Sequence, residues 1–350
     1  MSIHFNLAQE TRARILIEEI IERLSLDLCD SVVLTEMGSG PYLHTPMIAA
    51  LAGASKVIAL TKNSRFGTFE EIVANGEHIA ELWSVRDQIE VTDSLSGELI
   101  SQADIITNLG FLRPIDAEFV SHMKSGAVVS YMREAWEYRQ TDVDLQLCRL
   151  RNIPVMGTNE SIRDLDIFSF SGLLALKMLF DAGLEVKDNC IVVISRDKFG
   201  DTIERCLKAC GANIHRARTR DAVDVSRYQR LDAIIVATFS LEEMIIGSEG
   251  WLKVEQLKNL HPECVVIPFA GNLNAESLAS QGIRCHPPFS PGAYRMTHTL
   301  AELGPKPVID LHAAGLKVGE LMWREMQILN NAERVEKILA VKNSLCQRMP

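Results

Sequence analysis

The 350-residue chain lacks the sequence features of membrane-spanning, nucleic-acid-binding and disulfide-bonded proteins. No apolar run reaches the roughly 20 residues that cross a bilayer, and no apolar segment follows basic residues at the N-terminus. The net charge of −10 argues against a nucleic-acid or membrane-surface partner. The eight cysteines include no CxxC pair, so we expect reduced thiols, no metal and a cytoplasmic location. The remaining expectation is a globular protein with a small-molecule substrate.

No linker rich in glycine, proline or serine interrupts the chain, which alternates short β-branched runs with helical segments. Such runs are typical of buried parallel strands, and the alternation predicts doubly wound sheets. The first series has strands expected at 31–35, 56–60, 89–91, 104–108, 127–131 and 153–156. The second series has strands expected at 190–195, 213–217, 233–238, 264–269, 283–286 and 308–310.

A long helix expected at 165–182 carries apolar residues on more than one face, and another helix is expected at 316–339. We therefore predict an α/β fold of two Rossmann-like doubly wound domains joined by a long buried helix. The predicted parts are a substrate and catalytic domain (1–163), a nucleotide-binding domain (164–310) and a C-terminal helix that returns toward the first domain (311–350). The apolar connecting and terminal helices would also suit a homodimer.

The turn in IVVISRDKFG resembles an incomplete dinucleotide motif. The G-x-G-x-x-G spacing falls on Ser195, Asp197 and Gly200, so Asp197 puts a carboxylate where a phosphate would approach. Arg216 and Arg218 end the next strand and favour NADP over NAD. The expected cofactor contacts are Ser195, Arg196, Asp197, Phe199, Gly200, Arg216, Arg218, Thr238, Phe239 and Ala270. The alternative is a vestigial turn with solvated arginines.

Six segments, taken in order, resemble the D-2-hydroxyacid dehydrogenases of the formate/glycerate dehydrogenase type. They are DVDLQLCRLRNIPVMGTNES, DLDIFSFSGLLALKMLF, LEVKDNCIVVISRDKFG, DAIIVATF, CVVIPFAGNLNAESLASQG and VIDLHAAGLKVGELMWREM, which together cover about half of the chain. The resemblance implies an NAD(P)-dependent oxidoreductase with a small anionic substrate of the hydroxy/keto or amino/imino acid type in an interdomain cleft. It places His312 at the catalytic acid–base position, and Asp310 would share its face if the strand at 308–310 continues.

The chain departs from this family at its other catalytic positions. The family's carboxylate-binding arginine falls near Ala270, and its glutamate falls in PPFSPGAYR, which has no acidic residue. We expect Arg133, Arg295 and Glu302 to supply these roles, with Arg133 as the best carboxylate clamp. A catalytically lapsed protein that binds a nucleotide or a partner is the alternative.

The N-terminal half has its own glycine turn, in VVLTEMGSGPYLHT. Residues at the ends of its strands are expected to bind substrate, because open α/β sheets bind ligands there. These residues are Gly38, Ser39, Gly40, Asn108, Gly110, Arg113 and Tyr131. The same turn resembles the first motif of S-adenosylmethionine-dependent methyltransferases, a second alternative, although the next strand lacks the acidic end that such enzymes use. Ordinary turn glycines and a solvated arginine would explain these residues equally well.

Overall fold

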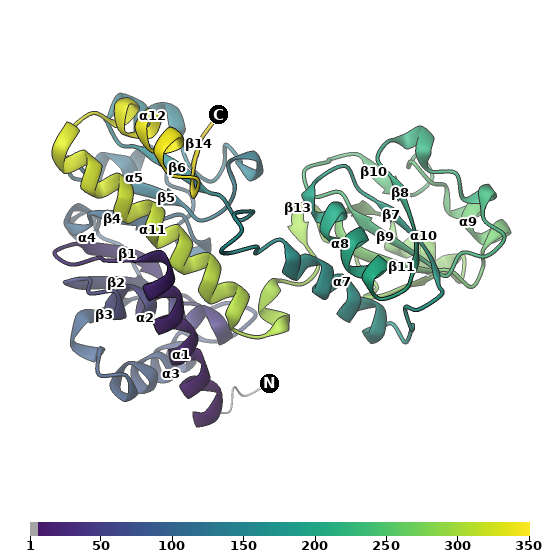
Figure 1. The fold of residues 1–350 in the computed structure, drawn as a ribbon, viewed down its shortest axis with the longest axis horizontal. Coiled ribbons are helices and arrows are strands. Elements are labelled where there is room, and N and C mark those ends of the chain that lie inside the picture. The colour runs from purple at the N-terminus through teal and green to yellow at the C-terminus, as the bar shows by residue number, and fades with distance from the viewer. Residues whose placement is uncertain (1–5) are drawn as a thin grey trace. The chain divides into compact units, whose positions relative to one another are not determined.

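The computed structural model describes residues 6–350, and the chain divides into two compact units. Unit 1 comprises Met1–Leu165 and Gly304–Pro350, and unit 2 comprises Asp166–Leu303 (Figure 1). The first division lies two residues beyond the predicted one. The predicted division at residue 310 falls inside a helix, because the return to unit 1 is made before that helix begins.

Unit 1 is built on a seven-stranded sheet in the order β14-β6-β5-β4-β1-β2-β3. Its strands are β1 (Val32–Glu36), β2 (Lys56–Leu60), β3 (Ile89–Thr92), β4 (Ile105–Thr107), β5 (Val128–Tyr131), β6 (Val155–Thr158) and β14 (Cys346–Arg348). Neighbouring strands are parallel except for β14, which runs antiparallel to β6. The strand order reverses between β1 and β4, so these two strand ends form the topological switch point where such sheets bind ligands.

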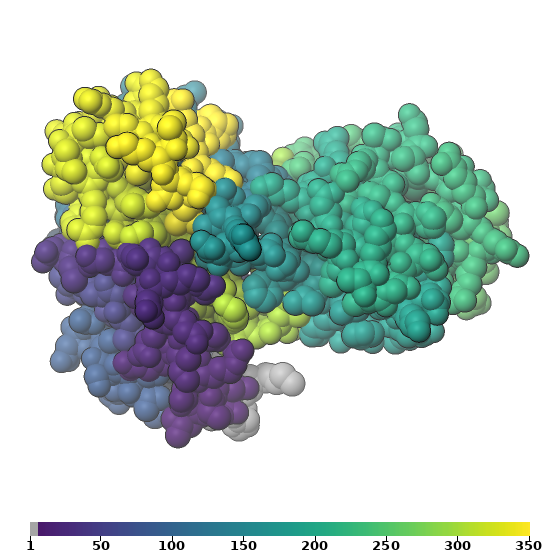
Figure 2. All heavy atoms as spheres, viewed as in Figure 1, coloured from purple at the N-terminus to yellow at the C-terminus, as the bar shows by residue number. Residues whose placement is uncertain are grey.

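Helices cover this sheet. They are α1 (Leu7–Leu24), α2 (His44–Leu51), α3 (Phe69–Leu82), α4 (Gly97–Gln102), α5 (Ala117–His122), α6 (Leu145–Leu150), α11 (Lys306–Leu329) and α12 (Ala332–Lys342). The long helix α11 packs across β4, β5 and β6 and against α1 and α2 (Figure 1). Gly319 permits this approach, since a Cβ there would lie 2.5 Å from Cγ2 of Ile105. The N-terminal and C-terminal helices cover much of the face of unit 1 in Figure 2.

Two predictions about the C-terminal region are wrong. Residues 308–310 are helical, because Pro307 suits a first helical turn and Lys306 pairs with Asp310 one turn later, at 2.6 Å. The single helix expected at 316–339 is broken between α11 and α12. Asn330 ends α11 in the left-handed conformation, and Asn331 caps α12 by accepting the N–H of Arg334 at 2.9 Å.

Unit 2 has a second sheet, in the order β10-β11-β9-β7-β8, with β12 and β13 also paired to β11. The strands are β7 (Cys190–Ile194), β8 (Asn213–Ala217), β9 (Ala233–Ala237), β10 (Met244–Ile246), β11 (Val265–Leu273), β12 (Arg284–Cys285) and β13 (Gly292–Met296). Only β13 is antiparallel to its neighbour. The sequence did not predict β10, which has only three residues, or β13, whose residues are half-buried or exposed.

The helices of unit 2 are α7 (Ser169–Asp181), α8 (Lys198–Ala209), α9 (Val254–Leu260) and α10 (Ala275–Ser280). The expected connecting helix is α7. It packs against α8 at Gly172, where a Cβ would lie 2.5 Å from Cβ of Cys206. Leu173 and Phe180 are exposed, so this helix is buried on one side rather than on several. In the described part of the chain, no helix has both the length and the apolar character needed to span a membrane.

Candidate functional site

Polar residues converge at the switch point of unit 1, beyond the carboxyl ends of β1, β4 and β5. Glu36 ends β1, and its Oε2 accepts the N–H of Phe111 at 2.8 Å. Burial raises the pKa of Glu36. Gly110 permits this contact, because a Cβ there would lie 3.3 Å from the same carboxylate oxygen. The carboxylate therefore joins the end of β1 to the turn that follows β4.

The predicted glycine turn lies at this edge and leads through a 3-10 turn, η1 (Gly40–Leu43), into α2. A Cβ at Gly38 would lie 2.8 Å from Cβ of Tyr42, and Gly40 has a φ of 59° with open space around it. Both glycines are thus required by the backbone. Ser39 is half-buried between them and precedes the 3-10 turn.

Asn108 is a buried side chain at this edge with an unmet hydrogen bond. Its Oδ1 accepts the N–H of Met132 at 2.8 Å, which ties the end of β4 to the end of β5. Its Nδ2 has no hydrogen-bond partner among residues 6–350, although the side chain is only 3% exposed. A buried donor without an acceptor is destabilising, so this amide nitrogen indicates a place for a ligand oxygen.

The arginines at this edge differ in how they are paired. Arg113 and Arg139 share the carboxylate of Asp142, each at 3.2 Å, and burial lowers the pKa of Arg113. Arg133 is half-buried, and no carboxylate in residues 6–350 forms an ion pair with it. Arg113 was predicted to bind substrate, and in the structure it is already ion-paired with Asp142. Arg133 is the cation left available for an anion.

Tyr131 and Glu137 are buried close enough to Arg133 for its positive charge to act on both. The Tyr131 hydroxyl donates to the Glu137 carbonyl at 3.1 Å, and burial raises the pKa of Tyr131 to about 12. Tyr131 is fully buried, so it is a core residue and not the substrate contact that the sequence predicted. Burial also raises the pKa of Glu137 to about 7, and the positive charge of Arg133 opposes that rise.

His312 belongs to unit 1 but lies on a helix rather than a strand. Its ring is 3% exposed, and its Nδ1 is 2.7 Å from the Thr45 hydroxyl on α2. Burial lowers the pKa of His312 to about 3, so the ring is neutral at physiological pH. Asp310 does not share its face, because residues two apart lie on different sides of a helix. His312 instead joins α11 to the helix that follows the glycine turn.

In unit 2, Asp197 closes the turn between β7 and α8. Its Oδ1 accepts the N–H of Phe199 at 3.1 Å and the hydroxyl of Ser195 at 3.0 Å, which caps α8. Its Oδ2 accepts the N–H of Phe239, after β9, at 3.0 Å. Burial raises the pKa of Asp197, while these three hydrogen bonds and Arg216 oppose that rise. One carboxylate thus takes N–H groups from two adjacent turns.

The arginines at the end of β8 do not act alike. The Arg216 guanidinium lies over Gly200 and donates to the carbonyls of Ser195 (2.6 Å) and Asp197 (3.1 Å). A side chain at Gly200 would collide with it, so this glycine permits the close packing of the arginine on the helix. Arg218 is 54% exposed and pairs with Asp201 at 2.8 Å, and Arg196 is exposed. Arg216 therefore stabilises the turn through hydrogen bonds, whereas Arg196 and Arg218 face solvent.

The remaining predicted contacts of unit 2 lie near the ends of β9 and β11. Phe239 and Phe199 have ring centroids 5.5 Å apart, behind the turn. The Thr238 hydroxyl is buried without a hydrogen-bond partner among residues 6–350. Gly271, next to the fully buried Ala270, has a φ of 103°, and a Cβ there would lie 2.8 Å from the Thr238 carbonyl oxygen. In the sequence, these contacts were predicted because the residues stand at the ends of expected strands.

Arg295 and Glu302 also belong to unit 2. Arg295 is exposed on β13, and Glu302 lies in a 3-10 turn, η7 (Leu300–Leu303), 3.8 Å from Nδ1 of His298. Within unit 2, the histidine that lies close to Glu302 is therefore His298.

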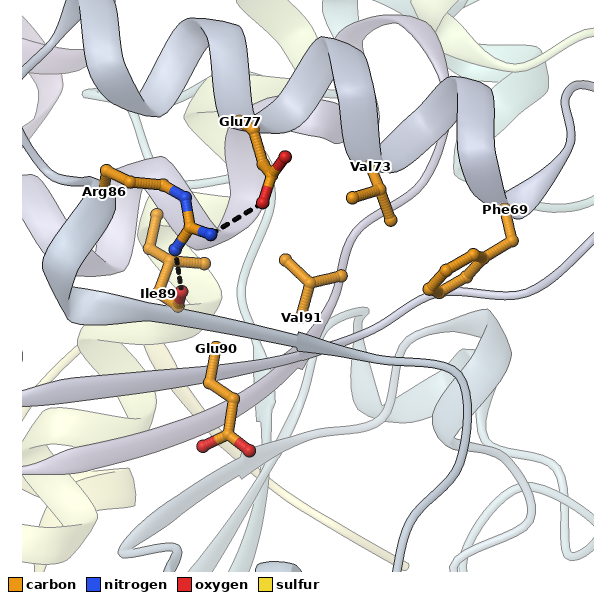
Figure 3. Close-up of a pocket in the computed structure, with 7 residues that line it drawn as sticks. All are labelled: Phe69, Val73, Glu77, Arg86, Ile89, Glu90 and Val91. Atoms are coloured by element: carbon orange, nitrogen blue, oxygen red, sulfur yellow. Dashed lines mark hydrogen bonds and ion pairs between the residues drawn. The ribbon is translucent and has the colours of Figure 1, made fainter.

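A separate pocket of about 320 Å³ lies at the far edge of the unit 1 sheet, between β3 and α3 (Figure 3). The Arg86–Glu77 ion pair, at 2.6 Å, crosses one side of it. The lining contains none of the predicted site residues, so this pocket is distinct from the switch point. The lining residues are Phe69, Val73, Glu77, Arg86, Ile89, Glu90 and Val91.

Solved structures with the same architecture put this geometry in context. Dipicolinate synthase A chain from Bacillus subtilis aligns with a TM-score of 0.54 at 13% identity, over 87% of this chain and 99% of that chain. The corresponding dipicolinate synthase chain from Bacillus halodurans aligns with a TM-score of 0.50 at 13% identity, over 82% and 96%. The pyruvate reductase of Chlamydomonas reinhardtii aligns with a TM-score of 0.50 at 10% identity, over 87% and 98%.

The chain shares the fold of these dipicolinate synthase chains and of this pyruvate reductase. No protein-family model and no curated sequence matches it. The fold resemblance stated from the sequence is therefore confirmed, at identities that make this a divergent chain. The likeness is one of architecture, so the chemistry has to be argued from the residues of the two sites.

Proposed function

We propose that the chain is a nicotinamide-dependent oxidoreductase that acts on a small carboxylic acid of the hydroxy/keto or amino/imino type. The observation that carries the proposal is Arg133, a half-buried guanidinium without a carboxylate partner at the switch point of unit 1. The fold supports it, because one structure that aligns with the chain is a pyruvate reductase, an enzyme named for a small keto acid.

In unit 1, the acid is held by donors that the protein leaves unsatisfied. The planar fork of Arg133 suits two carboxylate oxygens at once. The Nδ2 of Asn108, on the adjacent strand end, donates to a further oxygen or nitrogen acceptor of the substrate. This pair fits a carboxylate with a polar group on the next carbon. His312 has a positioning role in this proposal, because it fixes α11 against the helix that follows the glycine turn.

In unit 2, the donors fit the phosphates of a dinucleotide, with the Asp197 carboxylate standing where an anion would bind. The N–H groups of Phe199 and Phe239 would hold the pyrophosphate once that carboxylate leaves. Arg218 and Arg196 would accept the additional phosphate of NADP, which we propose as the preferred form over NAD. When bound, the nicotinamide supplies or accepts the hydride.

Binding and turnover test the proposal directly. Fluorescence titration with NADPH and NADH measures binding, and a panel of 2-keto acids and cyclic imino acids is then tested for oxidation of the bound nucleotide. Micromolar binding with oxidation by one of these acids supports the proposal. Binding without turnover across the panel, or no binding at all, favours the catalytically lapsed alternative.

Methyl transfer is the alternative that the geometry favours least. The Glu36 carboxylate already accepts a hydrogen bond from the N–H of Phe111. The strand β2 is followed by Thr61, Lys62 and Asn63 rather than by a residue with a carboxylate. Calorimetry with S-adenosylmethionine tests this reading, and we expect no heat of binding. The homodimer and the cytoplasmic location stay predictions, the first to be tested by sedimentation velocity.

A further inference from the structure

We propose that Asp197 is the affinity-determining residue of the nucleotide site, because its carboxylate competes with the phosphates of the nucleotide for the N–H groups of Phe199 and Phe239. This inference rests on the proposed function, since it concerns the same site in unit 2. It explains how a turn with only one of three motif glycines can retain its backbone shape.

The contacts of Asp197 identify it as an internal substitute for a bound anion. Its two carboxylate oxygens accept N–H groups from different turns, one at the start of α8 and one after β9. The Ser195 hydroxyl adds a third donor to the same carboxylate. Converging backbone N–H groups at a helix N-terminus are what phosphates bind in this fold. The donors are therefore retained and are occupied by the protein itself.

The rest of the turn is held in place, so Asp197 is the member that must move. Arg216 fixes the turn by donating to the Ser195 and Asp197 carbonyls from above Gly200. Its guanidinium is engaged with backbone oxygens and with the Asp201 carboxylate at 3.4 Å. A pyrophosphate and an ionised Asp197 cannot share the same donors, because their like charges repel at contact distance. Binding therefore requires the Asp197 side chain to rotate away.

Replacing Asp197 tests this competition with NADPH and NADH as probes. Asp197→Gly restores the glycine of the motif and frees both N–H groups, so we expect NADPH to bind at least about tenfold more tightly than to the wild-type protein. Asp197→Asn keeps one acceptor for the Phe199 N–H and loses the charge, so a smaller gain is expected. The matched control is Asp181→Asn, which removes an exposed, ion-paired carboxylate from the end of α7 in the same unit without touching either N–H group.

The control should bind NADPH within about threefold of wild type. Thermal unfolding of each variant shows that it is folded before titration. The inference is overturned if the wild-type protein binds the nucleotide and neither Asp197 variant binds it more tightly. It is also overturned if Asp181→Asn produces the same gain as Asp197→Gly. If wild type and all variants fail to bind NADPH and NADH, the proposed function fails and this inference fails with it.

Discussion

The two sheets are both largely parallel. They differ in whether the polar groups at their carboxyl edges have hydrogen-bond or ion-pair partners within the protein. In unit 1, the Nδ2 of Asn108 and the guanidinium of Arg133 have no protein partner among residues 6–350. In unit 2, the side chains of Asp197 and Arg216 form hydrogen bonds with the backbone groups of the turn. A strand-end turn thus offers its donors directly to a ligand in unit 1, whereas in unit 2 a side chain of the protein has to move first.

The largest effect is expected at the unpaired cation of unit 1. Arg133→Ala removes the carboxylate clamp and should lower kcat/KM for the acid substrate by about 100-fold, as loss of a charge-assisted bidentate contact does. Arg133→Lys should recover part of this loss, because the charge remains without the planar fork. Steady-state kinetics on purified variants measure both. Arg86→Ala, which removes a charge at the far edge of the same sheet, is the control and should match wild type.

One glycine in each unit has a positive φ, but only the glycine in unit 2 is also crowded by neighbouring atoms. Gly271→Ala places a Cβ 2.8 Å from the Thr238 carbonyl oxygen at a φ of 103° and should destabilise unit 2 by about 3 kcal/mol. Gly40→Ala meets open space at a φ of 59° and should cost about 1 kcal/mol. Urea unfolding followed by circular dichroism measures each. Equal losses from the two substitutions would contradict the difference in crowding.

Burial of His312 makes the stability of unit 1 depend on pH. Its pKa of about 3 in the folded chain lies below the unfolded value of 6.5, so unfolding takes up a proton between these values. Stability is therefore lost as the pH falls from about 6.5, amounting to about 2 kcal/mol by pH 5. The difference in unfolding free energy between wild type and His312→Asn, measured from pH 7.5 to 5, isolates this contribution. Parallel pH curves for the two proteins would show that the ring is not buried neutral.

The same variant distinguishes positioning from acid–base catalysis. A positioning role predicts that His312→Asn lowers kcat and leaves the shape of the pH–rate profile unchanged. Loss of one limb of that profile would instead make His312 the acid–base residue that the resemblance implied.

The smallest effect concerns the choice of nucleotide in unit 2. Arg218→Ala should weaken NADPH binding by about fivefold and leave NADH binding unchanged, because an exposed arginine contributes modestly to holding a phosphate. Fluorescence titration with both nucleotides measures the ratio. The control is Arg227→Ala, an arginine in the same unit that pairs with Asp224. Equal loss for the two nucleotides would place Arg218 away from the additional phosphate.

Much of the fold was predictable because buried parallel strands leave a local signal. The run at 56–60 coincides with β2, and the run at 213–217 coincides with β8. The errors have physical causes. The run at 308–310 looked like a strand because Val308 and Ile309 are β-branched, yet the Lys306–Asp310 pair and the packing of α11 across the sheet make it helical. The strand β14 is too short to leave a signal and is defined only by pairing with β6.

The sequence by itself determined which residues stand at the strand ends, including the departure at Asp197 and the arginines at 133, 216 and 218. Periodicity and turn chemistry are local, so these positions follow from the chain alone. Only the tertiary structure decided which of them are already satisfied. It buried Tyr131 and His312, paired Arg113 with Asp142, turned Asp197 onto two N–H groups and left Arg133 without an ion pair among residues 6–350. Those outcomes depend on contacts between residues far apart in sequence, which no local pattern encodes.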